Sequence, residues 1–158
     1  MWQLFGCYSR EAVMSQDFTT TFIVDQTPDE VFTAINNVRG WWGEDIQGGT
    51  DKLGDEFTYR YQDIHYSKQR ITGLEPGAKV VWHVLDANLN FTRDPAEWTG
   101  TDITFDISRH SGQTEVTFTH RGLVPEVECF DQCSNAWSYL VNSSLRELIT
   151  TGAEGGLR

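Results

Sequence analysis

Hydrophobic and polar residues alternate along much of the chain with a period of two, which is typical of half-buried β-strands. The alternation predicts strands over residues 17–24, 57–61, 65–74, 79–86, 101–107 and 114–120. From about residue 126 the period changes to 3.6, which predicts one long amphipathic helix that ends near Gly152. This order of elements indicates an α+β fold in which the C-terminal helix packs on an antiparallel sheet.

A short helix is predicted directly after the first strand. Thr27 stands at the N-cap, Pro28 at the first helical position and Glu30 three residues after the cap, which together form a capping box. Residues 36–43 then place polar residues and glycines around two adjacent tryptophans, so we expect an irregular turn or a second short helix there. Adjacent residues cannot share one helical face. We therefore expect one tryptophan in the core and the other at a rim, with Trp41 as a lid.

The predicted elements begin at residue 17 and end near residue 152, and we interpret residues 14–152 as a single domain. Residues 1–13 follow no period. They are either an extension from an upstream start that is not native or a short apolar arm that lies on the domain. Residues 153–158 are expected to form a loose tail.

Composition narrows the possible partners. The chain has 158 residues, a formal net charge of -11, 39% hydrophobic residues and 13% aromatic residues. A strongly negative chain repels phosphate backbones and anionic lipid headgroups, so we expect no nucleic acid partner. No apolar run approaches the roughly 20 residues of a membrane helix, and no basic leader precedes a hydrophobic stretch. We therefore expect no membrane insertion and a cytoplasmic location.

The three cysteines, Cys7, Cys129 and Cys133, are an odd number without a secretory context, and reduced thiols are expected. Cys129 and Cys133 are four residues apart on the predicted helix, where Cβ atoms lie roughly 5–6 Å apart, whereas a disulfide requires about 3.8 Å. Zinc would need two further ligands, and no second pair of Cys or His has a suitable spacing. We expect no metal and no cofactor. Buried, inert thiols are the simplest interpretation, and a redox or electrophile-sensing role is the alternative.

Several stretches of the sequence resemble a known superfamily. TPDEVFTAI, RGWWG, EWTGTDITF, FTHRGL and ECFDQCSNAWSYLVNSSLRELITTG resemble the START-like (SRPBCC) superfamily and, within it, the bacterial branch related to the heat-shock-protein-90 ATPase activator. The resemblance implies a helix-grip fold, in which a curved antiparallel sheet wraps around a long C-terminal helix and short helices follow the first strand. It also implies a cavity between sheet and helix. The activator has an additional N-terminal chaperone-binding domain that this sequence does not contain, so we do not expect co-chaperone activity.

Aromatic walls with a few polar groups are typical of small-molecule sites, so the leading hypothesis is a cavity that binds a small hydrophobic or aromatic molecule, a lipid included. Strand parity and helix spacing select eight residues to line it, and Trp41 is added as a lid. Together they are Trp41, Tyr59, Tyr61, Phe105, Phe118, His120, Cys133, Trp137 and Val141. A filled core, in which these aromatic side chains only pack against one another, is the alternative.

Two other functions remain open at this point. An enzyme of the cyclase or dehydratase type would use His83 and His120 as an acid/base pair, with Tyr59 or Tyr61 orienting a carbonyl. No Ser-His-Asp set, nucleophile elbow or redox motif accompanies these histidines, so the sequence favours binding over catalysis. A chaperone-interacting module would instead expose a broad apolar patch and have no internal cavity.

Overall fold

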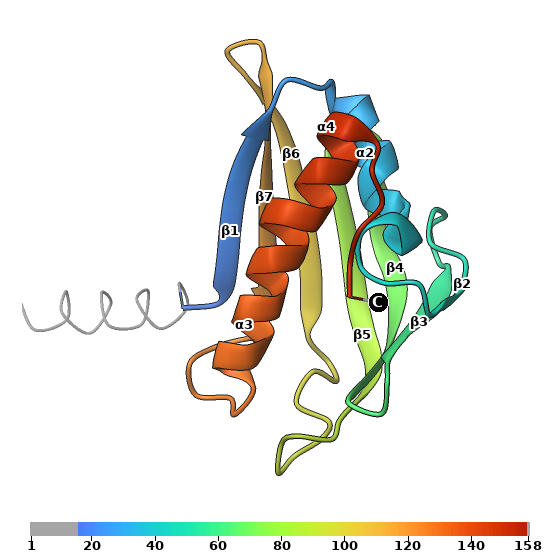
Figure 1. Cartoon of the computed structure of the whole chain (residues 1–158), viewed down its shortest axis with the longest axis vertical. Coiled ribbons are helices and arrows are strands. Elements are labelled where there is room, and N and C mark those ends of the chain that lie inside the picture. Colours follow the sequence, from blue (N-terminus) through green and yellow to red (C-terminus); the bar gives the residue numbers. More distant parts are fainter. Residues whose placement is uncertain (1–15, 158) are drawn as a thin grey trace, which may run out of the picture.

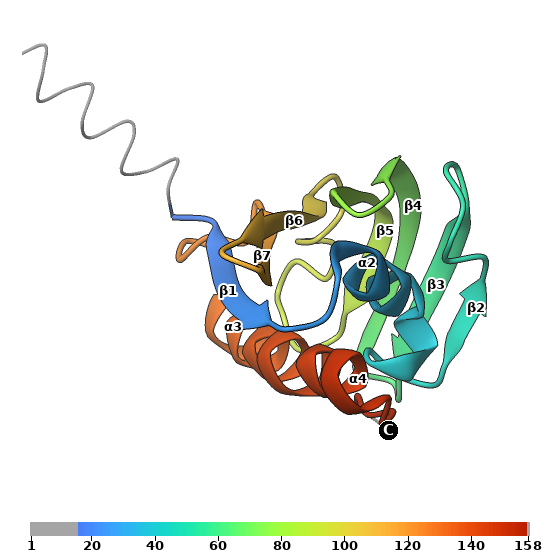
Figure 2. The same cartoon turned by 90° about the horizontal axis from the view of Figure 1, so that it is seen from above.

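A computed structural model describes residues 16–157, which form one curved antiparallel sheet with helices along its concave face (Figures 1 and 2). The strands are β1 (Phe18–Val24), β2 (Ile46–Gly48), β3 (Glu56–Tyr61), β4 (His65–Glu75), β5 (Lys79–Leu89), β6 (Asp102–His110) and β7 (Gln113–Arg121). The helical elements are α2 (Pro28–Asn36), the 3₁₀ turn η1 (Val38–Gly40), α3 (Phe130–Tyr139), the π-helical segment η2 (Leu140–Leu145) and α4 (Arg146–Thr151). This arrangement confirms the predicted α+β helix-grip fold. Residues 1–13, for which two interpretations were left open, lie outside the described residues.

The seven strands follow the order β1-β7-β6-β5-β4-β3-β2, so β1 and β2 form the two edges. Every pairing is antiparallel. Seen from above, the sheet curves around the run of α3, η2 and α4, and α2 covers the other part of the concave face (Figure 2). The first strand is joined by hydrogen bonds to the last, which brings β1 beside the C-terminal half of the chain.

The capping box that the sequence predicts is present at the start of α2. The Glu30 amide donates to the Thr27 hydroxyl at 3.2 Å, and the Thr27 amide donates to the Glu30 carboxylate at 3.1 Å. The two bonds satisfy amide groups that have no partner within the helix. The turn after α2 is the short η1 helix, as one of the two alternatives for residues 36–43 predicted.

The C-terminal helix begins at Phe130 rather than near residue 126. The carboxylate of Glu97 accepts hydrogen bonds from the Glu128 amide at 2.8 Å and from the Cys129 amide at 3.1 Å, and so replaces the helical partners in the preceding turn. The helix widens into a π-helical turn over η2, a feature that often accompanies functional sites. Within residues 16–157, no helix is long and apolar enough to cross a membrane.

Strand β5 continues to Leu89, beyond the predicted end at residue 86. Gln69 pairs with Val84 and Lys68 pairs with Asp86, so one extra residue of β5 bulges out between these pairs. The bulge shifts the inward parity of β5 by one residue, and Ala87 is therefore buried. A pattern of strict alternation cannot include such a shift, which explains why the sequence predicted too short a strand.

The tail after α4 is held at residues 155–157, whereas residues 153–158 were expected to be loose. The Gly155 amide donates to the Gly40 carbonyl at 3.0 Å, and the Leu157 amide donates to the Trp42 carbonyl at 3.1 Å. In Figure 1 this segment runs from the end of α4 back along the helix toward the middle of the molecule. Backbone hydrogen bonds to a segment distant in sequence hold it there, and no local pattern predicts them.

Candidate ligand-binding site

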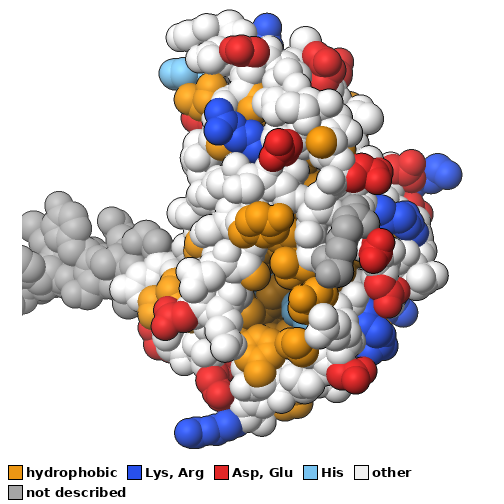
Figure 3. Space-filling model, viewed as in Figure 1, with side chains coloured by type: hydrophobic (Ala, Val, Ile, Leu, Met, Phe, Trp, Pro, Cys, Tyr) orange, Lys and Arg blue, Asp and Glu red, His pale blue; other side chains and the backbone are white. Residues whose placement is uncertain are grey.

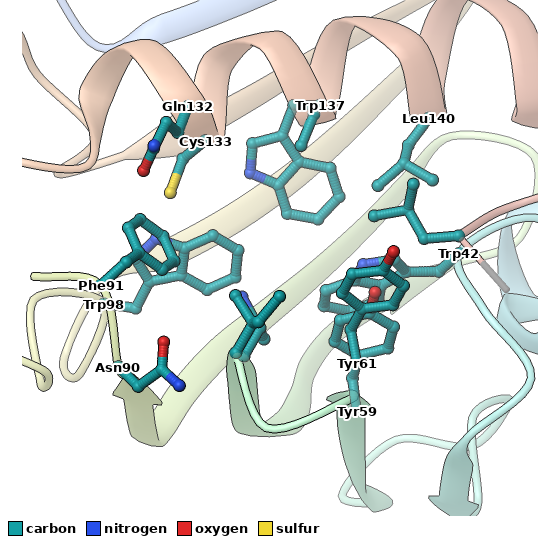
Figure 4. A pocket seen from close by; sticks show the side chains of 14 residues that line it. Trp42, Tyr59, Tyr61, Asn90, Phe91, Trp98, Gln132, Cys133, Trp137 and Leu140 are labelled. Carbon is teal, nitrogen blue, oxygen red and sulfur yellow. The ribbon is translucent and has the colours of Figure 1, made fainter.

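A cavity of about 400 Å³ lies between α3, β3, β4 and the loop that follows β5. Its opening is visible as a hollow lined by hydrophobic side chains in Figure 3, and Figure 4 shows the side chains around it. The residues that line it are Trp42, Tyr59, Tyr61, Ile64, His65, Asn90, Phe91, Trp98, Gln132, Cys133, Ala136, Trp137, Leu140 and Leu157. The volume falls within the range of roughly 300–1,000 Å³ that is usual for small-molecule sites.

Two stacked aromatic pairs form much of the wall. Trp42 and Tyr59 stack with ring centroids 4.2 Å apart and an interplanar angle of 17°. Trp98 and Trp137 stack at 5.7 Å and 14°. The imidazole of His65 lies between the pairs, 5.1 Å from the Tyr59 ring and 4.5 Å from the Trp98 ring, with an edge-to-face geometry in both contacts. Rings that pack in this way fix one another's orientation, so the wall is pre-formed.

His65 is held in its neutral form. One of its ring nitrogens, Nε2, lies 3.1 Å from the Ser67 hydroxyl. Burial lowers the pKa of His65 to about 3, because the charged imidazolium would lose its hydration in this apolar surrounding. A base with so low a pKa removes protons poorly at neutral pH, so the site offers a weak general base at most.

Tyr59 provides a polar group that has no hydrogen-bond partner within residues 16–157. Its side chain is 1% exposed, and its hydroxyl forms no hydrogen bond among the described residues. Burial is the main reason why the pKa of Tyr59 lies above its ordinary value, so the hydroxyl stays protonated and can both donate and accept. A buried hydroxyl without a partner is costly, and a bound molecule or water that reaches it would remove that cost.

His120 is enclosed in a chain of hydrogen bonds behind the cavity wall. The indole N–H of Trp137 donates to His120 Nδ1 at 3.1 Å, which fixes the proton of the neutral ring on Nε2. Nε2 then donates to the Thr101 hydroxyl at 2.8 Å, and Thr101 donates to the Trp98 carbonyl at 2.6 Å. Burial, with a smaller contribution from His65, lowers the pKa of His120 to about 3. Both ring nitrogens are occupied, so His120 positions Trp137 and Trp98 rather than a ligand.

The second histidine proposed for catalysis, His83, lies on the other face of the sheet. Its side chain is 39% exposed, and Nδ1 lies 2.8 Å from a carboxylate oxygen of Asp102 on the neighbouring strand. Trp82, its neighbour in sequence, points into the core with 0% exposure. Strand alternation therefore directs His83 away from the cavity, and the proposed pair of His83 and His120 is not brought together.

Cys133 forms part of the cavity wall, and Cys129 lies one helical turn away; both thiols are free and buried. The pKa of Cys133 lies above its ordinary value, because its thiol donates to Cys129 and is shielded from water. Cys133 therefore contributes a neutral, weakly polar surface. Within residues 16–157, no group of three or more His, Cys, Asp or Glu side chains is arranged to hold a metal ion.

The structure brings four of the nine predicted residues to the cavity: Tyr59, Tyr61, Cys133 and Trp137. Five lie elsewhere in the core and do not line the cavity: Trp41, Phe105, Phe118, His120 and Val141. Strand parity selects the inward face correctly but gives no position along the strand. The middle of the concave face is filled by packed rings, such as Phe105 and Phe118, whose ring centroids are 5.2 Å apart. The cavity lies to one side of them, next to β3 and β4.

Both adjacent tryptophans are buried, at 0% and 2% exposure, although one was expected at a rim and Trp41 was expected to be a lid. Trp41 is fully buried, donates its indole N–H to the Ile35 carbonyl at 3.0 Å and stacks on Trp82. Trp42 lines the cavity instead. Trp41 is therefore not a lid, because its polar atom finds its partner inside α2.

Sequence reasoning missed most of the remaining wall, and one part of it could have been found. Tyr61 and His65 face each other across the tight turn between β3 and β4. Because the inward parity of Tyr59 and Tyr61 was recognised, pairing the two strands across that turn would have placed His65 on the same face. Phe91 and Trp98 belong to a loop, where no periodic pattern gives the direction of a side chain.

No protein-family model matches the chain, and no curated protein sequence matches it. Solved structures do match in their fold. The Aha1 dimer from Colwellia psychrerythraea superimposes with a TM-score of 0.71 and 22% identity, covering 86% of this chain and 97% of that one. The chain therefore shares its helix-grip fold with this Aha1 protein.

Two further structural matches are more distant in sequence. A protein from Staphylococcus saprophyticus has a TM-score of 0.63 and 20% identity, over 88% of this chain and 95% of its own. DynU16, a protein of the dynemicin biosynthetic locus, has a TM-score of 0.64 and 15% identity, over 88% of this chain and 49% of its own. The superpositions show a common fold, and at identities this low the function has to be argued from the cavity.

Proposed function

We propose that this protein binds a small, uncharged aromatic molecule in the cavity between β3, β4 and α3. The observation that carries the proposal is the cavity wall, with its two stacked aromatic pairs. One wall residue, Tyr59, also has a buried hydroxyl without a partner among the described residues. Burial of apolar ligand surface would supply most of the binding energy, at roughly 25 cal/mol per Å². The Tyr59 hydroxyl would fix the orientation of a polar substituent.

The charges around the cavity favour an uncharged ligand. Among the described residues that line it, none is Lys, Arg, Asp or Glu, and the pKa of about 3 keeps His65 neutral. The net charge of -11 adds long-range repulsion of anions. An anionic group inside this wall would lose its hydration without gaining a counter-charge. Fatty acids and other carboxylates therefore fit the site less well than neutral ring systems.

Fluorescence titration with a matched pair of dyes tests this specificity. N-phenylnaphthylamine is neutral, and anilinonaphthalene sulfonate has the same ring skeleton with an added sulfonate. We expect the neutral dye to bind at least about tenfold more tightly, which corresponds to about 1.4 kcal/mol. Equal affinities, or tighter binding of the sulfonate, would contradict the argument from charge.

A pair of substitutions on α3 tests the location. Ala136 lines the cavity, so Ala136→Trp should fill it and weaken binding of the neutral dye by at least about tenfold. Asn135→Trp introduces the same side chain at the adjacent exposed position and is the matched control. If both variants bind the dye as the parent does, the ligand site is not this cavity.

A catalytic role has less support than binding. His65 is the histidine that lines the cavity, and its neutral state with a low pKa makes it a poor base. The exposed large hydrophobic side chains among the described residues, Ile23, Leu53, Ile64 and Tyr139, come from separate elements rather than one stretch of chain. They give no specific support to a chaperone-binding surface.

A further inference from the structure

The segment that follows α4, residues 152–157, forms a strap. It returns along the helix and attaches to the turn that follows η1 (Figure 1). The Gly155 amide donates to the Gly40 carbonyl at 3.0 Å, and the Leu157 amide donates to the Trp42 carbonyl at 3.1 Å. Gly43 and Leu157 also form an isolated parallel β-bridge. The strap is thus bound to the same short turn that carries Trp42 into the cavity wall.

Two glycines allow the strap to approach this closely. A Cβ atom on Gly156 would lie 2.7 Å from the Trp42 carbonyl oxygen and 2.8 Å from that of Trp41, and its φ of +101° disfavours any other residue. A Cβ atom on Gly155 would lie 2.8 Å from Ser144 Oγ, the hydroxyl that donates to the Trp41 carbonyl at 2.7 Å. Backbone atoms cannot move aside as a flexible side chain can. Glycine at both positions is therefore required by the close approach of the strap to Trp41, Trp42 and Ser144. A tail without such contacts would have no need of glycine there.

Leu157 is the strap residue that reaches the cavity. It is partly buried, packs against the hydrophobic core and lines the cavity together with Trp42 and Leu140. By contrast, residues 152–154 of the strap are exposed. The strap therefore contributes one apolar side chain to the wall and is otherwise outside it.

We propose that the strap forms a wall of the cavity and that Leu157 is a specificity-determining residue, which sets the size of the aromatic ligand that the site accepts. That an aromatic ligand binds here rests on the proposed function. That the strap is part of the wall rests on the contacts of Gly155, Gly156 and Leu157. Most other wall residues belong to strands, to α3 or to stacked ring pairs, which have little freedom to move. The strap is held at Leu157 through the backbone, by the hydrogen bond to Trp42 and the bridge to Gly43, so a substitution of this side chain keeps those contacts and changes the shape of the wall.

Substitutions of Leu157 in opposite directions test the proposal. Leu157→Ala enlarges the cavity, and Leu157→Trp narrows it. Two neutral probes report the size preference: naphthol, with two fused rings, and N-phenylnaphthylamine, which carries an additional ring. We expect Leu157→Trp to weaken binding of the larger probe by at least about tenfold while naphthol changes by less than about threefold. Leu157→Ala should weaken the binding of naphthol about 3- to 10-fold, because naphthol loses its apolar contact with the leucine. The affinity for the larger probe should not change.

Leu53 provides the matched control, because it is 66% exposed and lies in the loop before β3. Leu53→Ala and Leu53→Trp should leave the ratio of the two affinities unchanged. If the Leu157 variants behave as the Leu53 variants do, while the parent protein binds the probes, the strap proposal is overturned and the proposed function stands.

A second measurement tests the strap without any ligand. Gly156→Ala should detach it, because its methyl group would meet two backbone carbonyls, whereas Gly112→Ala introduces the same change at a φ of +80° with no atom within 4 Å. Acrylamide quenching of tryptophan fluorescence should rise in Gly156→Ala relative to Gly112→Ala, because the cavity tryptophans become accessible. Equal quenching in the two variants, both folded by circular dichroism, overturns the proposal. If neither probe binds the parent protein, the proposed function fails and the quenching comparison alone decides on the strap.

Discussion

The buried imidazole of His120 should make the protein unstable in mild acid, and the size of the effect follows from its pKa. The side chain is 0% exposed, Trp137 donates to Nδ1, and the folded-state pKa is about 3. In the unfolded chain a histidine titrates near 6.5. Between these two values the unfolded state binds a proton that the folded state does not. The free energy of unfolding therefore falls as the pH decreases from above 6.5 toward 3.

The magnitude can be worked out from the same pKa values. From pH 7 to pH 5 the unfolded histidine becomes almost fully protonated while folded His120 stays neutral. Linkage then gives a loss of about 2 kcal/mol for this one residue. His65, with its pKa also lowered to about 3 by burial, should contribute a similar loss of about 2 kcal/mol.

Urea unfolding followed by tryptophan fluorescence at pH 7 and pH 5 measures this effect. His120→Gln removes the titrating group, so the variant should lose about 2 kcal/mol less than the parent between the two pH values, whatever its stability at pH 7. His110→Gln removes an exposed histidine and is the matched control. If His120→Gln loses as much stability as the parent, or if the control reproduces the effect, the assignment of a neutral buried His120 is refuted.

Three further substitutions test individual contacts, each by urea unfolding at pH 7. Thr27→Ala removes the capping box with Glu30 and should lower the free energy of unfolding by about 1 kcal/mol, and an unchanged midpoint would contradict the role of the cap. Trp137→Phe keeps an aromatic ring but leaves His120 Nδ1 without a donor, so we expect a loss of about 1–3 kcal/mol beyond that from the smaller ring. Tyr59→Phe removes a hydroxyl that has no partner, so the free protein should be unchanged or slightly more stable, while its affinity for naphthol decreases about tenfold and that for N-phenylnaphthylamine is retained. A clear loss of stability in Tyr59→Phe would mean that the hydroxyl has a partner in the protein.

The fold was largely predictable because its signals are local. Alternation of hydrophobic and polar residues identified six of the strands, and the change of period identified the long helix. The capping box marked the start of α2 because its bonds join residues three apart in the sequence. The short edge strand β2 was missed, since its three residues are too few to establish a period.

The cavity depended on contacts that no local pattern contains. Strand parity placed Tyr59 on an inward face, and helical spacing did the same for Trp137. Only the packing of sheet and helix decided that there is space beside them and none around Phe105. The bulge in β5 changed which residues of that strand point inward.

The sequence by itself determined the types and order of the elements and the aromatic content of the concave face, because these depend on residues that are near one another in the chain. It also determined the acidic charge, which depends on composition alone. The tertiary structure decided that Trp42 rather than Trp41 faces the cavity, that His120 is neutral, and that Leu157 returns to the wall. Each of these outcomes depends on a hydrogen bond or close approach that only the folded chain can bring about. For His120 and Leu157, the partners lie in other elements of the fold.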